Sequence, residues 1–269
     1  EISLGLVGSE MCIRDRNNYM QEQIILGLDI STKCIGVSIV KLDNNGNKKI
    51  IEITHVTPKI NSKIKGIEQL FLKKRVFEEK FLLEYADKGI TKVVIEEPLL
   101  RSNNVNTVDI LSKFNGMISD SVYRILGIVP EYISSYDARK YAFPELMAIR
   151  KFNKKGEEYS KDKILTAIKK NKLVLFGEYP FDCDKKLILW NKISELYPYI
   201  PWVYDKKGEL KKENFDASDA LVTCLAICNK IEFGEAEFNI TSSDNVKSSE
   251  ISYLMEVWDK KIPKKIIID

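Results

Sequence analysis

Histidine is nearly absent from this chain of 269 residues, which contains only His55. Serine and cysteine hydrolases generally need a histidine base beside the nucleophile. His55 falls in a predicted strand, and the sequence has no glycine-flanked serine of the nucleophile-elbow type. We therefore interpret His55 as a packing or surface residue and find little support for hydrolase chemistry of that kind.

Cysteine is also scarce, and none of the five residues forms a CxxC pair or lies near the histidine. An odd, scattered set of this kind indicates free thiols in a reducing, cytoplasmic compartment. Two of them stand four residues apart on a predicted helix, where cysteine usually packs as a small apolar side chain. We do not expect a zinc site at any of them: Cys12, Cys34, Cys183, Cys224 and Cys228.

Long apolar runs are missing as well, and no stretch approaches the roughly 20 residues that a membrane span requires. With 44% hydrophobic and 30% charged residues, the composition is that of an ordinary globular protein. The formal net charge of +3 excludes no class of partner. An acidic site and basic flanks can cancel in a nucleic-acid enzyme.

The chain is expected to form one core domain with additions. Residues 1–19 resemble translated adapter or vector sequence, so we expect a disordered, non-native leader, with Met20 as the natural start. The core domain is expected over residues 20–232 and contains a Lys- and aromatic-rich insertion at about 137–213. Residues 233–269 are expected to form a C-terminal extension.

The first part of the core has the pattern of an antiparallel meander. Residues 24–31, 34–42 and 50–56 are rich in Ile, Val and Leu, which favours strands. The segment "DNNGN" at 43–47 is a turn sequence, because Asn and Gly accept positive φ. Three strands joined by short turns form such a meander.

Helices and strands then alternate. Apolar residues at three- and four-residue spacings predict a helix over 62–87, and the short apolar run at 92–97 predicts a buried parallel strand. A helix at about 105–126, a strand at about 130–135 and a final helix over about 213–230 follow. This order predicts an α/β protein of the RNase H-like fold. Its five-stranded mixed sheet would combine the meander with two parallel strands and be flanked by helices.

Four acids stand where this fold would bring them together. Asp29 lies inside the first strand, where an ionised group needs a hydrogen-bond partner, a base or a metal. Glu96 ends the fourth strand, and Asp216 and Asp219 are three residues apart on one face of the last helix. Four converging carboxylates would repel one another unless cations neutralise them. Mg²⁺ suits this role, and two ions about 4 Å apart can drive phosphodiester hydrolysis.

Three motifs around these acids resemble those of the RuvC family of Holliday junction resolvases. They are "LGLDISTKCIGVSIV", "VVIEEPLL" and "DASDALVTCLAI", and the resemblance covers about residues 24–135 and 213–230. It implies a divergent, phage- or virus-type member that takes part in DNA recombination and repair. The implied activity is that of a structure-selective endonuclease with two Mg²⁺ ions, which Mn²⁺ can replace, on DNA such as four-way junctions.

The resemblance also implies the ligands of those ions, namely Asp29, Glu96, Asp216 and Asp219. Glu97 competes with Glu96 for its role, and we favour Glu96 because it directly follows "VVI", as in the family. Junction cleavage needs two active sites, which implies a homodimer. The surplus apolar positions of the helix at 62–87 are a candidate dimer face.

The sequence departs from the family pattern in two places. Ser31 stands where many relatives carry glycine, and the segment before the last helix is longer than in compact bacterial resolvases. The first motif also resembles that of pre-ribosomal-RNA nucleases, but their second motif lacks "IEE". An actin-like or sugar-kinase phosphotransferase remains an alternative, although its phosphate loop needs a glycine that "DIST" does not supply. A non-catalytic nucleic-acid-binding protein on the same fold is a third interpretation.

Basic side chains near the expected site are candidate contacts for DNA phosphates. Arg139 and Lys140 follow the fifth strand and should lie near the edge of the sheet that carries the acids. The lysines of the insertion, with neighbouring aromatic residues, fit either strand binding or a solvated surface around helices at 161–171 and 185–196. The complete candidate set is Lys33, Arg101, Arg139, Lys140, Lys154 and Lys155.

Overall fold

The computed structural model describes residues 21–98, 104–143, 147–149, 157, 160, 174–176 and 184–233. Three expectations lie outside these residues, namely the leader at 1–19, the helix at 161–171 and nearly all of the C-terminal extension. The division of the chain into domains therefore stays a prediction.

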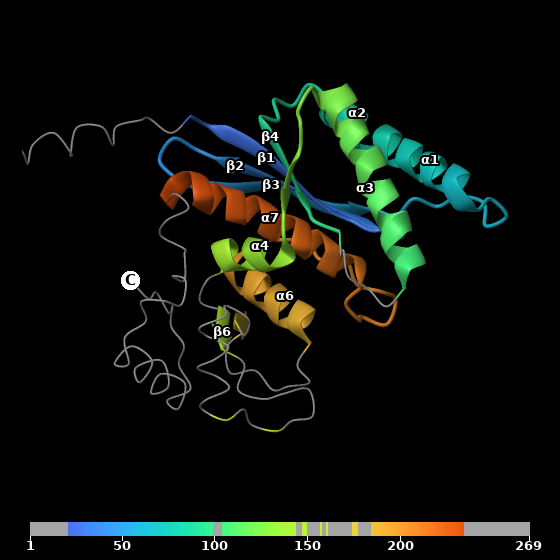
Figure 1. Cartoon of the computed structure of the whole chain (residues 1–269). Helices are drawn as coiled ribbons and strands as arrows, with labels where there is room; N and C mark the ends of the chain where they lie inside the picture. Colours follow the sequence, from blue (N-terminus) through green and yellow to red (C-terminus); the bar gives the residue numbers. More distant parts are fainter. Residues whose placement is uncertain are drawn as a thin grey trace, which may run out of the picture.

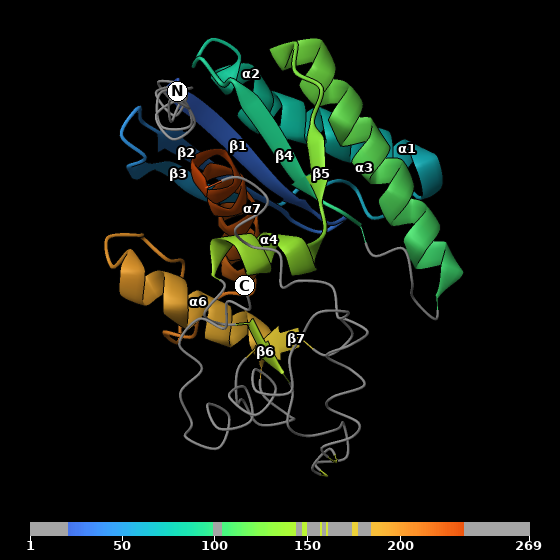
Figure 2. The same cartoon turned by 60° about the vertical axis from the view of Figure 1, so that its left-hand side comes forward.

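The described part of the chain contains a five-stranded sheet in the order β3-β2-β1-β4-β5 (Figures 1 and 2). β1 pairs antiparallel with β2, and β2 with β3, while β1, β4 and β5 run parallel. This is the sheet of the RNase H-like fold, so the predicted fold class is confirmed. The strands are β1 Gln23–Ile30, β2 Ile35–Leu42, β3 Lys48–Val56, β4 Lys92–Glu96 and β5 Glu131–Ile133.

Helices cover both faces of the sheet (Figure 1). One face packs against a continuous helical segment and the long helix α3, Val105–Leu126. That segment consists of α1 Gly66–Phe77, the π-helical turn η2 Glu78–Leu82 and α2 Leu83–Tyr85. The opposite face packs against α7, Glu213–Phe233. The sheet is therefore buried on both sides, as the apolar runs of its strands predict.

Side chains of β1 alternate between these two layers. Leu26 and Leu28 are fully buried in the cluster that includes residues of α1 and α3. Ile25 packs in the cluster that includes α7, and Gly27 lies directly against that helix. Because alternate residues of a strand share a face, Asp29 points to the α7 side as well.

Two glycines let α7 approach the sheet closely. A Cβ atom on Gly36 of β2 would overlap the backbone carbonyl of Asp216, and one on Gly27 would overlap the carbonyl oxygen of Ala220. Neither position has room for a side chain. The backbone of α7 therefore rests almost directly on β1 and β2.

The helix predicted over 62–87 is shorter than expected at its start. Lys65 is extended (φ −135°, ψ 171°), and Gly66 has a positive φ of 67°. The helical path cannot continue backwards through these conformations, so the boundary at residue 62 was wrong. The helix also contains the π turn η2, which period-based reasoning does not reveal.

The strand predicted over 130–135 ends at Ile133. Ser134 caps a helix instead, because its hydroxyl accepts a hydrogen bond from the backbone N–H of Asp137. This helix, α4 Ser135–Ala142, packs against α7 and was not predicted.

The described part of the insertion is not purely helical. The predicted helix at 185–196 is present as α6, Lys185–Leu196. A small antiparallel pair, β6 Met147–Ile149 and β7 Val174–Phe176, was not expected. α6 lies against α7 on the side away from the sheet (Figures 1 and 2).

Within the described residues, no helix is long and apolar enough to cross a membrane. Cys34, Cys224 and Cys228 are buried free thiols, and the other two cysteines lie outside these residues. The expectation that Cys224 and Cys228 pack in the core of the domain is confirmed.

Candidate metal centre

Asp29 and Glu96 are neighbours across the centre of the sheet. The parallel register pairs Leu28 with Ile95, so the next residues, Asp29 and Glu96, lie side by side at the carboxyl ends of β1 and β4. Glu96 is half-buried, two residues after Val94, which packs in the α7-side cluster, whereas Glu97 is exposed. Alternation along β4 therefore directs Glu96 and not Glu97 toward α7.

The first turns of α7 bring two more acids to the same edge. Asp29 pairs with Gly36 in the β1–β2 register, and the backbone of Asp216 rests on Gly36. Asp219 follows on the same helix and is only 3% exposed. The fold thus brings together all four acids that the sequence analysis singled out, the first and last of which are 190 residues apart (219 − 29 = 190).

Mutual repulsion and burial perturb these carboxyl groups. Burial raises the pKa of Asp29 well above its ordinary value, and the charges of Glu96, Asp219 and Asp216 raise it further. Burial and then the charge of Asp219 raise the pKa of Glu96 to about 7. The pKa of Asp216 is raised as well, mainly by burial. Such a cluster holds excess negative charge and attracts cations.

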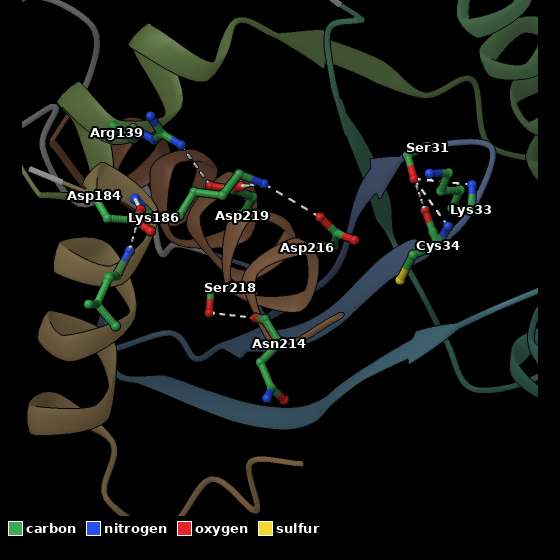
Figure 3. Close-up of polar contacts among 11 residues, drawn as sticks. Ser31, Lys33, Cys34, Arg139, Asp184, Lys186, Asn214, Asp216, Ser218 and Asp219 are labelled. Atoms are coloured by element: carbon green, nitrogen blue, oxygen red, sulfur yellow. Dashed lines mark hydrogen bonds and ion pairs between the residues drawn. The ribbon is translucent and has the colours of Figure 1, made fainter. Parts of the chain in front are cut away.

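Two basic side chains from the insertion contact the α7 acids (Figure 3). Arg139 of α4 donates from Nη2 to Oδ1 of Asp219 at 2.9 Å, and its side chain is only 17% exposed. Lys186, in the first turn of α6, places Nζ 3.2 Å from Oδ2 of Asp219 and 3.5 Å from Oδ1 of Asp216. Burial lowers the pKa of this lysine, but the charges of Asp219, Asp29 and Asp216 together outweigh burial and raise the pKa above its ordinary value.

The structure places three of the six candidate DNA contacts. Lys33 is exposed in the turn between β1 and β2. Arg139 contacts Asp219 instead of an open surface, and half-buried Lys140 lies with Nζ 5.6 Å from the ring centroid of Tyr141. The remaining candidates lie outside the described residues: Arg101, Lys154 and Lys155.

Lys186 is the site residue that the sequence analysis missed. The helix that carries it was predicted, and Asp184 caps that helix by accepting from the N–H groups of Lys186 and Leu187. A capping Asp before a Lys pair was the available signal. It could not tell which lysine faces the acids, because that depends on how α6 packs against α7.

The four acids fit a hard divalent cation by donor type and by charge. Carboxylate oxygens are the ligands that Mg²⁺ prefers in proteins. No three Asp, Glu, His or Cys side chains of the described residues are arranged as a ready metal site. Oxygen atoms of Asp216 and Asp219 instead contact Lys186 and Arg139. A metal would therefore have to replace at least one of these contacts.

A cavity of about 530 Å³ opens beside Asp216. The charged residues of its lining are balanced, because the lysines Lys33, Lys186 and Lys212 stand against the acids Asp184, Glu213 and Asp216. This size is typical of pockets that take a small molecule or part of a larger one.

The raised pKa of Glu96 predicts a pH-dependent stability. The unfolded chain releases this proton near pH 4.5, but the folded protein holds it up to about pH 7. Between these values the folded state binds more protons, so stability falls as pH rises. In EDTA, we expect Glu96→Gln to raise Tm relative to the unmodified protein at pH 7.5 but much less at pH 4.5. Thermal unfolding followed by circular dichroism measures this difference.

The matched control for this experiment is Glu97→Gln, at the exposed neighbouring position. It should shift Tm by the same small amount at both pH values. A Glu96→Gln difference that does not grow with pH would contradict the assigned environment of Glu96.

The sequence matches no protein-family model and no curated protein. Among solved structures, the chain is similar to RuvC of T. thermophilus in complex with a Holliday junction substrate. The identity is 10%, the TM-score 0.43, and the match covers 79% of this chain and 96% of that one. The yeast mitochondrial Holliday junction resolvase Ydc2 has 12% identity and a TM-score of 0.44, and the match covers 83% of this chain and 85% of that one. The Aquifex aeolicus PPX-GPPA enzyme has 14% identity and a TM-score of 0.33, and the match covers 80% of this chain and 94% of that one.

The fold itself follows from the strand pairs of this chain. Three antiparallel strands continue into two parallel ones, and helices cover both faces. The chain therefore contains an RNase H-like domain with four carboxyl groups gathered at the carboxyl edge of its sheet.

Proposed function

We propose that this chain is a divalent-metal-dependent DNA endonuclease. The observation that carries the proposal is the convergence of Asp29, Glu96, Asp216 and Asp219 at one sheet edge. These residues would hold Mg²⁺, or Mn²⁺ in its place. When bound, two such ions would activate a water and stabilise the leaving oxygen of a phosphodiester.

The remaining residues of the site position these acids. The Asp29 backbone is held within the sheet between β2 and β4, so its carboxyl group has little freedom to move away. The hydrogen bond from Arg139 orients the carboxylate of Asp219. Asp216 lies in the first turn of α7, where the positive end of the helix dipole favours negative charge. The same dipole would favour a DNA phosphate approaching this edge.

The finer proposal is that the substrate is branched DNA, such as a four-way junction. It is supported by the three motifs that resemble the RuvC family. Symmetric cleavage of a junction needs two active sites, so we propose a homodimer. Ile67 and Phe71 of α1 are 52% and 54% exposed and offer apolar surface for such contact.

In the test, the purified full chain is incubated with labelled DNA substrates in Mg²⁺ or in EDTA. The substrates are four-way junctions, forks, flaps and linear duplexes. We expect paired nicks in the junction with Mg²⁺ and no cleavage in EDTA. Equal cleavage of the linear duplex would contradict selectivity for branched DNA but not the nuclease assignment.

Two other outcomes would overturn the nuclease proposal. ATP turnover without DNA would favour a phosphotransferase of the actin-like class. DNA binding without cleavage, in both Mg²⁺ and Mn²⁺, would favour a non-catalytic binding protein.

A further inference from the structure

The ammonium group of Lys186 lies among the four acids as a built-in counter-cation. Its Nζ contacts the carboxylates of Asp216 and Asp219 at 3.5 Å and 3.2 Å, and its charge also acts on Asp29 and Glu96. Asp219 has a side chain only 4% exposed, so this attraction is weakly screened by solvent. Lys186 thus offsets part of the repulsion that the gathered carboxylates create.

A divalent metal would need the same oxygen atoms. Mg²⁺ binds carboxylate oxygens at about 2.0–2.1 Å and accepts little deviation from octahedral geometry. Oδ1 of Asp216 and Oδ2 of Asp219, two oxygens that such a metal would use, contact Lys186 in the structure. A dication and an ammonium group also repel each other at such distances. Binding of the metal and the present position of Lys186 therefore oppose each other.

Lys186 has a place to move without disturbing its helix. Its side chain is 47% exposed and lines the 530 Å³ cavity beside Asp216, together with Lys33 and Lys212. The backbone of α6 is held by the Asp184 cap, so a change of side-chain rotamer is sufficient. Once a metal compensates the charge of Asp216, the three lysines of the lining outnumber its two remaining acids, Asp184 and Glu213. That excess of positive charge favours an anion such as a phosphate of the DNA strand.

We propose that Lys186 is an exchangeable cation. It neutralises Asp216 and Asp219 until a divalent metal displaces it into the cavity, where Lys33 and Lys212 join it in binding a DNA phosphate. The inference rests on the proposed nuclease function and adds an order of binding to it. The metal binds first, and its binding releases Lys186 for the phosphate site. Removal of Lys186 should thus have opposite effects on the two ligands, with tighter metal binding and weaker DNA binding.

The experiment measures both ligands on the full chain with Lys186→Met, which keeps an apolar stem and removes the charge. Mn²⁺ alone, followed by the electron paramagnetic resonance signal of the free ion, should bind about tenfold tighter than to the unmodified protein. A labelled junction in Ca²⁺, followed by fluorescence anisotropy, should bind about tenfold more weakly.

Two variants control for charge and for folding. Lys206→Met removes the same charge from an exposed position outside the cavity lining and should leave Mn²⁺ affinity unchanged. Lys186→Arg keeps the charge and should keep Mn²⁺ affinity within about twofold of the unmodified protein. If Lys186→Met does not fold, Lys186→Gln is measured in its place.

The outcomes separate this inference from the proposed function. If the unmodified protein binds no Mn²⁺, the nuclease proposal itself fails. If it binds Mn²⁺ and Lys186→Met binds it equally or more weakly, the exchange is overturned while the nuclease proposal stands. If Mn²⁺ binds tighter but DNA affinity is unchanged, the transfer of Lys186 to a phosphate site is wrong.

Discussion

Asp29→Asn should lower the rate of DNA cleavage at least about a thousandfold, to the background of the assay. The asparagine fits the same space in β1 but removes the charge that two neighbouring ions would share. Cleavage of a labelled four-way junction under single-turnover conditions measures the effect. The variant should fold normally, because it relieves the repulsion that raises the pKa of Asp29.

Thermal unfolding in EDTA supplies the second half of this prediction. Asp29→Asn should have a Tm equal to or above that of the unmodified protein. Asp109→Asn, at an exposed position of α3 paired with Lys113, is the matched control and should cleave at the normal rate. Cleavage that persists in Asp29→Asn would rule out this carboxylate as a shared ligand.

Gly36→Ala should destabilise the protein by about 3 kcal/mol or more. The new methyl group would overlap the backbone carbonyl of Asp216, and neither the strand nor the helix end can shift without breaking its own hydrogen bonds. Urea unfolding at fixed pH measures the loss. Because α7 has to move away from β2, cleavage by the fraction that folds should fall as well.

Gly116→Ala is the matched control for this substitution. Gly116 lies in α3, and a Cβ atom built there would meet nothing within 4 Å. Alanine is the better helix former, so this change should stabilise the protein by up to about 1 kcal/mol. An equal, small effect of both substitutions would show that α7 does not lie as close to β2 as described.

Local patterns were sufficient to predict the sheet and the positions of the four acids. Apolar runs, the turn at 43–47 and the strand order are sufficient to predict that Asp29 and Glu96 lie at one edge of the sheet. Periodicity placed Asp216 and Asp219 on one face of a helix. These features depend on residues near each acid in the sequence.

The basic half of the site depends on packing between distant segments. The sequence predicted that Arg139 lies near the acids, but not its contact with Asp219 or the position of Lys186. Arg139 reaches Asp219 because Ser134 starts a short helix where a longer strand was expected. Lys186 reaches the acids because α6 packs against α7 after an insertion with little regular pattern. In the same way, nothing in the sequence around Gly27 and Gly36 indicates that the backbone of α7 packs directly on them.

The position of α7 on β1 and β2 also has a consequence for synthesis of the protein. The strand with Asp29 leaves the ribosome 187 residues before Asp216 (216 − 29 = 187), which is roughly 10 to 40 s at ordinary translation rates. Until then the nascent chain has a sheet with one bare face and only half of its acids. If the chain has the proposed nuclease function, it gains that activity only after its last helix docks. Truncation ahead of α7 would leave an exposed apolar sheet prone to aggregation.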